Sequence, residues 1–356
     1  MSQFVRRFDT LPLLLFSLAV FGFLYFPLVV LVLFSFNASR LMMDWQGFTL
    51  LWYRILAGDV LMLDSLVNSL WVAGWTTLLS WLVGVPAGVG LARGFQRGKA
   101  VFEGLLLLPL IVPENVMAAA FAAVFGVVKL QLSFTSIILA HVAFSLSYVI
   151  MLVRSRMARL DSALLEAAMD LNATERVVFF RVILPHLTPA MVAATLMVFT
   201  ISLDDYVITS FVAGVGNTTL PLHIYSLAKE GLTPEINALC AVLLVLTLLM
   251  ALLAHWVQRS VFSWRKTAPA LVLLVRLMGG APLWNRWSTA AEQWQRLHLF
   301  IWSGYLGPDT LKIFEQRFNA RVQCDLYDSN EALLAKLQSG NAGYDIVVPG
   351  DYIIQA

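Results

Sequence analysis

Residues 165–172 read LEAAMDLN, and the triplet ILP stands further along at 183–185. This stretch lies in a basic loop between two long apolar runs, 134–153 and 190–213. An acidic residue, two alanines, a residue suited to a turn and a closing Leu-Pro indicate two short helices. A rigid helical segment between two membrane spans can transmit the movement of a motor protein outside the membrane to those spans. The loop therefore decides how the rest of the chain is interpreted.

The first helix of the loop is expected to begin next to Asp161 or Ser162, either of which can cap it. Asn172 can adopt the left-handed backbone conformation that stops this helix. Its apolar residues are expected to lie on one side of the helix, and they are Leu164, Leu165, Ala168 and Leu171.

The second helix is expected to be capped by Thr174 and to carry apolar residues over 177–180. Leu184-Pro185 is predicted to end it, because proline restricts the residue before it. Taken alone, the loop is also compatible with an ordinary amphipathic connector.

The composition places most of the chain in lipid. Hydrophobic residues make up 59% and charged residues 13% of the 356 residues, whereas a soluble domain carries about 25% charge. The formal net charge of +2 and the scattered cations give no basis for nucleic-acid binding. Cys240 and Cys324 are far apart and indicate neither a disulfide framework nor a metal site.

Six apolar runs are long enough to cross a bilayer core, which needs about 20 residues in a helix. We therefore predict an all-α polytopic membrane protein with six transmembrane helices. The first run is too long for a signal peptide and is interpreted as a retained anchor. The runs are 11–35, 66–92, 104–128, 134–153, 190–213 and 236–257.

The loops alternate in positive charge, which predicts the orientation. Cations gather before the first run, after the second, between the fourth and fifth, and after the sixth. The positive-inside rule then places the N-terminus, the 154–189 loop and the end of the sixth run in the cytoplasm.

Several segments together resemble a known family. They are SFNASR at 35–40, DWQGFT at 44–49, WY at 52–53, SLDD at 202–205, LPLHIYS at 220–226 and PEINA at 234–238. With the loop at 165–185, they resemble the permeases of ABC importers and, among these, the spermidine/putrescine permeases of bacterial inner membranes. The resemblance covers residues 20–262. One departure is Asn172, where the family usually has glycine; asparagine tolerates the same backbone.

The resemblance implies that the loop docks onto a separate ATPase. The residues that carry this role are Glu166, Ala167, Ala168, Asp170, Asn172, Leu184 and Pro185. The implied partners are ATPase subunits, a second permease subunit, a periplasmic polyamine-binding protein and a polycationic substrate. ATP and Mg²⁺ are used by the ATPase, and no cofactor is expected on this chain. The segment 94–100 only approximates a phosphate loop, because its glycines are too close and Ala100 replaces the Ser/Thr.

Ionisable residues within the apolar runs are candidates for a translocation path, because a charge in lipid is costly unless it faces a bundle interior or an aqueous path. Glu114 lies within the third run, Asp204 and Asp205 within the fifth, and His141 within the fourth. Acidic groups at intervals, with Tyr residues nearby, suit the separated ammonium groups of a polyamine. The structural alternative is that these residues cap a helix or pair with a neighbouring one.

The C-terminal part has a different pattern. Strands and helices are expected to alternate over 297–301, 309–318, 322–326, 330–338 and 345–348, which is the start of an open α/β sheet. We divide the chain into a permease domain at 1–262, a linker or extra membrane segment at 263–296, and a partial α/β domain at 297–356.

The partial domain resembles the N-terminal part of a periplasmic polyamine-binding protein. The resemblance places ligand contacts at Trp302, Ser303, Tyr305 and Tyr352, whereas Gly350 departs from the serine usual there. With so little chain, we expect a truncated fragment that cannot fold alone. Six spans leave it in the cytoplasm unless residues 267–284 form a seventh.

Three other functions stay open at this point. A permease for another solute is one, and a non-transporting membrane receptor or structural protein is another. A secondary transporter is the third, although neither paired inverted halves nor broken helices are evident in the sequence. The sequence does not distinguish spermidine from putrescine.

Overall fold

The computed structural model describes residues 10–39, 44–94, 98–230, 234–260, 295–302, 305–306, 310–327, 330–338 and 343–350. The chain divides into two compact units. One comprises residues 1–60 with 231–250, and the other comprises 61–230 with 251–356.

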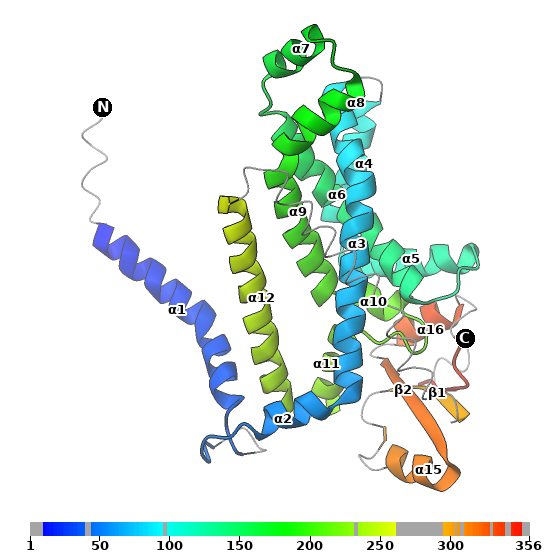
Figure 1. Ribbon diagram of the computed structural model, residues 1–356. Helices are drawn as coiled ribbons and strands as arrows, with labels where there is room; N and C mark the ends of the chain where they lie inside the picture. Colours follow the sequence, from blue (N-terminus) through cyan, green and yellow to red (C-terminus); the bar gives the residue numbers. More distant parts are fainter. Residues whose placement is uncertain are drawn as a thin grey trace. The chain divides into compact units, whose positions relative to one another are not determined.

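The first unit contains two long apolar helices and one short helix (Figure 1). Helix α1 (Thr10–Phe34) is apolar on all sides, and none of the side chains of its most apolar stretch is buried. Helix α12 (Pro234–Ser260) is the other long helix, and α2 (Leu51–Gly58) is short. A helix that is hydrophobic all round and unburied within its own chain is suited to contact lipid or another subunit.

Hydrogen bonds around Asn37 fold the segment between α1 and α2. The Asn37 side chain donates to the carbonyl of Asp44 at 2.8 Å and accepts from the backbone N–H of Gln46 at 2.9 Å. The indole of buried Trp52 donates to the Asn37 carbonyl at 2.7 Å. The described residues of these motifs, at 35–39, 44–49 and 52–53, are therefore joined by hydrogen bonds.

Three long helices form the frame of the second unit. They are α3 (Val60–Arg93), α6 (Phe134–Met157) and α9 (Leu184–Asp204), and α7 (Ser162–Asp170) lies at one end of them (Figure 1). Their shared core includes Val153, Leu187 and Ala194. Glycines at 84 and 88 bring α3 close to α6, because a Cβ at Gly88 would lie 2.7 Å from a Val153 methyl.

The third apolar run is not one helix, which corrects the prediction over 104–128. It forms α4 (Lys99–Ile111) and α5 (Glu114–Val127), which meet at an angle of 110°. Pro113 causes the break, because it has no backbone N–H and pushes Val112 into an extended conformation (ψ 130°). Four described helices are long and apolar enough to cross a membrane, or five if this bent pair is one span.

The fifth apolar run also differs from the predicted 190–213. Helix α9 begins earlier, at Leu184, and ends at Asp204. Asp205 then has an extended backbone, and the short helix α10 (Val207–Val212) follows. Helix α11 (Leu220–Glu230) completes the helical part of this unit and packs against α9.

The described residues from 295 onward form three parallel strands and two helices. The strands are β1 (Gln295–Trp302), β2 (Ala320–Tyr327) and β3 (Ile346–Val348), in the spatial order β2-β1-β3. The helices are α15 (Thr310–Phe318) and α16 (Asn330–Gln338). Phe300, Tyr327 and Leu333 form its small core. The alternation matches the sequence-based expectation, whereas the proposed seventh span at 267–284 lies outside the described residues.

Candidate functional site

The loop between α6 and α9 begins with a capped helix. The Asp161 carboxylate accepts a hydrogen bond from the Ala163 N–H at 3.0 Å, so Asp161 rather than Ser162 caps α7. At the other end Asn172 has φ 59°, the left-handed conformation expected from the sequence. The chain therefore reverses at Asn172 with little strain for a non-glycine residue.

The apolar residues expected on one side of this first loop helix do fall within one arc of its circumference, but they differ in burial. Leu165 and Ala168 pack against the core of α3, α6 and α9. Leu164 and Leu171 are instead 55% and 83% exposed, and Met169 is 51% exposed. Leu164 lies only about 40° around the helix from Ala168, so it flanks the inward face and stays exposed at its edge. The helix is thus anchored through Leu165 and Ala168 and leaves apolar side chains exposed beside that contact.

The polar residues of α7 lie on its outer surface. Glu166, Ala167 and Asp170 are exposed, and Glu166 makes no ion pair with any residue that the structure describes. An exposed carboxylate beside exposed leucines is suited to contact another protein rather than to stabilise this fold. The predicted docking residues of α7 are therefore available at the surface.

The second helix of the loop does not end at Leu184-Pro185, contrary to the prediction. Helix α8 (Glu175–Val178) runs through a wider turn at Phe179–Ile183 directly into α9. The Leu184 N–H donates to the Phe179 carbonyl five residues back. This wide turn gives room for the Pro185 ring, which would otherwise clash with a carbonyl four residues earlier. Thr174 stands before α8, but its hydroxyl makes no capping hydrogen bond.

Asp205 and His141 belong to a buried polar network that joins α6, α9 and α10. The His141 ring lies 2.7 Å from the Ser202 hydroxyl and 3.0 Å from the Asp205 carboxylate. Asp205 also accepts from the Thr209 N–H at 2.8 Å and the Thr209 hydroxyl at 2.7 Å, which caps α10. Both residues are almost fully buried. In this conformation the network fixes the end of α9 and leaves little of Asp205 for a ligand.

Glu114 and Asp204 are the two exposed acids of the candidate path. Glu114 begins α5 directly after the break at Pro113, and Asp204 is the last residue of α9. Glu114 lies close enough to both Asp204 and Asp205 for their charges to interact. The two helix breaks therefore bring together carboxylates that are 90 residues apart in the sequence.

One aromatic ring lies beside these acids in the sequence, and it stacks on the ring of a more distant tyrosine. Tyr206 follows the aspartate pair, and its ring packs on Tyr225 of α11 with 4.2 Å between centroids. The Lys229 ammonium lies 5.0 Å from the centre of the Tyr225 ring, so this aromatic pair already holds a cation. Tyr225 was not identified as a site residue from the sequence, although it lies within the LPLHIYS motif.

Comparisons with known proteins agree with this arrangement. The family described as "Binding-protein-dependent transport system inner membrane component" matches residues 84–265, which include the α7 loop, Glu114 and Asp204. The chain belongs to this family. It is a multi-pass inner membrane protein and a transport subunit rather than an enzyme.

Two curated relatives of this permease are polyamine transport permeases. The chain is 41% identical over 245 residues to the spermidine/putrescine transport system permease protein PotC of Haemophilus influenzae, covering 69% of this chain and 95% of the relative. It is 38% identical over 231 residues to the putrescine transport system permease protein PotI of Escherichia coli K12, covering 63% and 82%. The permease is therefore homologous to subunits of polyamine ABC importers.

A solved structure has the same fold. It is a bacterial ABC transporter involved in import of the acidic polysaccharide alginate, with a TM-score of 0.56 and 16% identity. The match covers 74% of this permease and 99% of that chain. At this identity the likeness concerns the fold alone.

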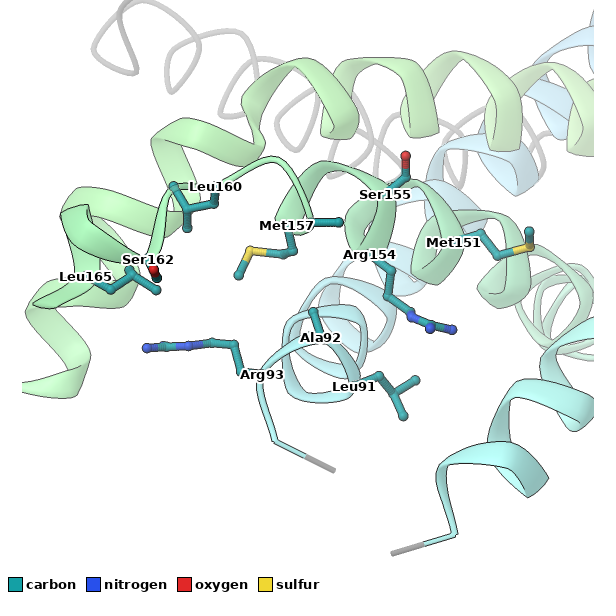
Figure 2. A pocket seen from close by; sticks show the side chains of 11 residues that line it. Leu91, Ala92, Arg93, Met151, Arg154, Ser155, Met157, Leu160, Ser162 and Leu165 are labelled. Atoms are coloured by element: carbon teal, nitrogen blue, oxygen red, sulfur yellow. The ribbon is translucent and has the colours of Figure 1, made fainter. Parts of the chain in front are cut away.

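A cavity of about 540 Å³ lies between the ends of α3 and α6 and the start of α7 (Figure 2). Arg93 from α3 and Arg154 from α6 line it, together with Ser162 and Leu165 of α7. Arg154 forms an ion pair with Glu103 of α4. The cavity thus lies where the loop meets the helical frame. From the sequence, its arginines were used only to predict which side of the membrane each loop occupies.

The candidate ligand residues of the C-terminal sheet are partly described. Trp302 is half-buried and meets Tyr327 edge-on, with 5.2 Å between centroids, whereas Tyr305 is 68% exposed. Ser303 and Tyr352 lie outside the described residues. A Cβ at Gly350 would lie 2.8 Å from the Asn330 side-chain nitrogen, so a serine there would require Asn330 to move.

A charged pair is buried beneath this sheet. Burial lowers the pKa of Lys336 to about 8, although nearby Asp325 favours its charged form. Burial raises the pKa of Asp325, whose carboxylate accepts a hydrogen bond from the Tyr344 hydroxyl at 2.9 Å. Lys336 also lies 4.9 Å from the centre of the Phe300 ring. These groups hold α16 to the sheet and face its interior.

Proposed function

We propose that this permease is the membrane-spanning subunit of an ATP-driven importer for polyamines such as spermidine and putrescine. The observation that carries the proposal is its 41% identity to a spermidine/putrescine permease over 95% of that protein's length. Similarity of this extent includes both the α7 loop and the helices that bear the acidic residues.

The outward face of α7 is proposed to dock onto a separate ATPase subunit. Leu164, Met169 and Leu171 offer apolar area, and Glu166 offers a charge that a basic group on the ATPase can pair with. Leu165 and Ala168 anchor the helix in the frame. A displacement of α7 therefore reaches α9 through the continuous α8–α9 connection. ATP and Mg²⁺ act in the partner, and this chain needs no cofactor of its own.

Glu114 and Asp204 are proposed to contact the moving substrate. Both carboxylates are exposed, near each other, and located at helix breaks. Two acids near the Tyr206–Tyr225 pair suit ammonium groups separated by methylene chains. Asp205 and His141 are proposed to act as positioning residues, because their polar atoms are occupied by Ser202 and Thr209.

Six membrane crossings are proposed, with α4 and α5 as one bent crossing. The others are α1, α3, α6, α9 and α12. The cations near the α7 end of the frame support a cytoplasmic position for that end and for the N-terminus. The proposed partners are two ATPase subunits, a second permease subunit and a periplasmic polyamine-binding protein.

The C-terminal sheet is proposed to be a fragment of a polyamine-binding protein joined to the permease. Its parallel order and the aromatic residues Trp302 and Tyr305 near the carboxyl end of β1 support this. Its side of the membrane depends on residues 267–284.

Uptake of radiolabelled spermidine tests the proposed function. Cells that lack their own polyamine import would carry the ATPase, the partner permease and an intact binding protein, with or without this chain. Uptake should require this chain and ATP, and unlabelled putrescine should compete. Absence of uptake while the chain is inserted and the ATPase is bound would assign another solute. Absence of ATPase binding would overturn the importer assignment.

Two substitutions separate coupling from substrate contact. Glu166→Lys should abolish uptake while insertion and expression persist, and Glu175→Lys, in the same loop but outside α7, is the matched control. Asp204→Asn should raise the spermidine concentration needed for half-maximal uptake, and Asp44→Asn, at an exposed acid outside both sites, is its control. Normal uptake by Glu166→Lys would contradict the coupling role, and an unchanged concentration dependence in Asp204→Asn would contradict the path.

A further inference from the structure

The cavity behind α7 lies at the ends of two helices that are long and apolar enough to cross a membrane. The span of α3 ends at Arg93 and that of α6 at Met157, and both residues line the cavity. Helix α7 begins beyond this level and contributes Ser162 and Leu165 to the wall. Phospholipid headgroups occupy the same level at the edge of a bilayer.

The walls of the cavity are apolar toward the bilayer and cationic at the rim. Leu91 and Met151 lie deeper along α3 and α6, and Met151 is 42% exposed. Figure 2 shows the Arg93 side chain extending from the end of α3 to the part of the cavity lined by Ser162 and Leu165. The apolar residues lie deeper along the helices and the basic residue lies at the rim. A phospholipid has the same order, with its acyl chains toward the bilayer interior and its phosphate at the surface.

The rim carries one cation without a counter-charge. Arg154 is already paired with Glu103, so that pair contributes no net charge. Arg93 makes no ion pair or hydrogen bond with any residue in the described part of the chain. A phosphodiester carries a single negative charge, and a guanidinium can bind two of its oxygens side by side.

We propose that this cavity binds the phosphate of an anionic phospholipid, with Arg93 as the principal contact. Ser162 lines the same cavity, and its hydroxyl can donate to a remaining oxygen. One acyl chain lies along Leu91 and Met151. The bound lipid then bridges the frame and the start of α7, so the stiffness of the coupling loop depends on the lipid. The inference requires only that α3 and α6 cross the membrane and is independent of the solute.

Lipid retention by the assembled transporter tests the proposal. The full complex would be reconstituted in nanodiscs that contain phosphatidylcholine with spin-labelled phosphatidylglycerol or spin-labelled phosphatidylcholine. The motionally restricted fraction of each label reports how strongly that lipid is preferred. Wild type should prefer phosphatidylglycerol, and Arg93→Gln should reduce this preference about fivefold, the effect of about one interfacial cation.

Three variants make the result specific. Arg159→Gln removes an exposed cation from the same region but not from the cavity, and it should leave the preference unchanged. Arg93→Lys should retain part of the preference, because the charge remains. Met151→Trp should reduce the restricted fraction without changing any charge, because it fills the acyl track. Spermidine uptake is not part of this readout, so failure here is distinct from failure of the proposed function.

Three outcomes would contradict the proposal. Equal preference in wild type, Arg93→Gln and Arg159→Gln would overturn the site. Displacement of the restricted label by inorganic phosphate would show a site for soluble anions and overturn the lipid assignment. A cross-link from Arg93→Cys to the ATPase, with no lipid preference in wild type, would show that protein fills the cavity. If Arg93→Gln does not assemble, the lysine and tryptophan variants decide the question.

Discussion

Pro113 and Pro185 stand at two helix junctions of the same chain, and their effects are opposite. After Val112 and Pro113 the chain turns by 110° before α5 begins. At Leu184 and Pro185 the helix continues from α8 into α9. One proline separates two helices, and the other lies inside a continuous one.

The difference lies in the residue before each proline. Val112 has ψ 130°, the extended conformation that proline favours in its predecessor. Leu184 has φ −60° and ψ −43°, which is helical. The wide turn at Phe179–Ile183 separates the proline ring from the carbonyl it would meet in an ordinary helix. The conformation of the preceding residue therefore distinguishes these two junctions.

The two junctions also have different tasks in the proposed mechanism. The break at Pro113 places Glu114 at the start of α5, near Asp204. The continuous junction connects the α7 loop to α9, which ends at Asp204. A rigid connection transmits the movement, and a break exposes the charge that meets the substrate.

The largest effect on uptake is expected when the continuous junction between α8 and α9 is interrupted. Phe180→Pro should abolish uptake, because proline inside a helix costs about 3 kcal/mol and separates α8 from α9. Phe180 is 60% exposed, so its core contacts are not the reason for the loss. Phe180→Ala is the control for lost surface contact and should retain most uptake. Uptake is measured with labelled spermidine, and normal uptake by Phe180→Pro would show that the junction need not be continuous.

The second test removes the break. Pro113→Ala should lower uptake by about tenfold, within the usual range of coupling energies, because α4 and α5 can then extend toward each other and move Glu114. Pro109→Ala, inside α4, is the matched control, since it lies in a segment that is already helical. Cysteine accessibility at Asn115 would report the change in α5. Unaltered accessibility and uptake would mean that the bend does not depend on Pro113.

A third test concerns the frame that holds both junctions. Gly88→Ala should destabilise the protein by about 1–3 kcal/mol, because its Cβ would lie 2.7 Å from Val153 on α6. Gly90→Ala is on the same helix with no atom within 4 Å of the added Cβ, and it should be neutral or slightly stabilising. Thermal unfolding in detergent measures both variants. Equal stability of the two would contradict the close packing of α3 and α6.

The smallest effect is expected at the second proline. Pro185→Ala should change uptake and stability by less than about 1 kcal/mol, because the wide turn at Phe179–Ile183 already accommodates the proline ring. The comparison with Pro113→Ala, measured in the same uptake assay, is the direct contrast between the two junctions. A loss as large as that of Pro113→Ala would show that Pro185 itself shapes the coupling loop.

The parts of the fold that the sequence predicts well depend on local signals. The cap at Asp161, the left-handed turn at Asn172 and the strand-helix alternation after 295 need only nearby residues. The sequence did not predict the size of the 110° bend or the wide turn at 179–183, because both depend on more than the proline itself. It also placed Asp204 and Asp205 together, whereas burial against His141 separates their roles. Such differences arise from packing between helices that are distant in the sequence.

Disulfide cross-linking between α7 and the ATPase shows whether the α7 loop is the surface that couples the permease to the ATPase. Leu171, which is 83% exposed, would be changed to cysteine after replacement of Cys240 and Cys324 by serine. The ATPase would carry single cysteines along its membrane-facing groove. We expect a cross-link from Leu171→Cys whose yield changes when ATP binds, and none from the inward-facing Leu165→Cys. An intact complex without any cross-link from the outer face of α7 would contradict the claim that this loop is the coupling surface.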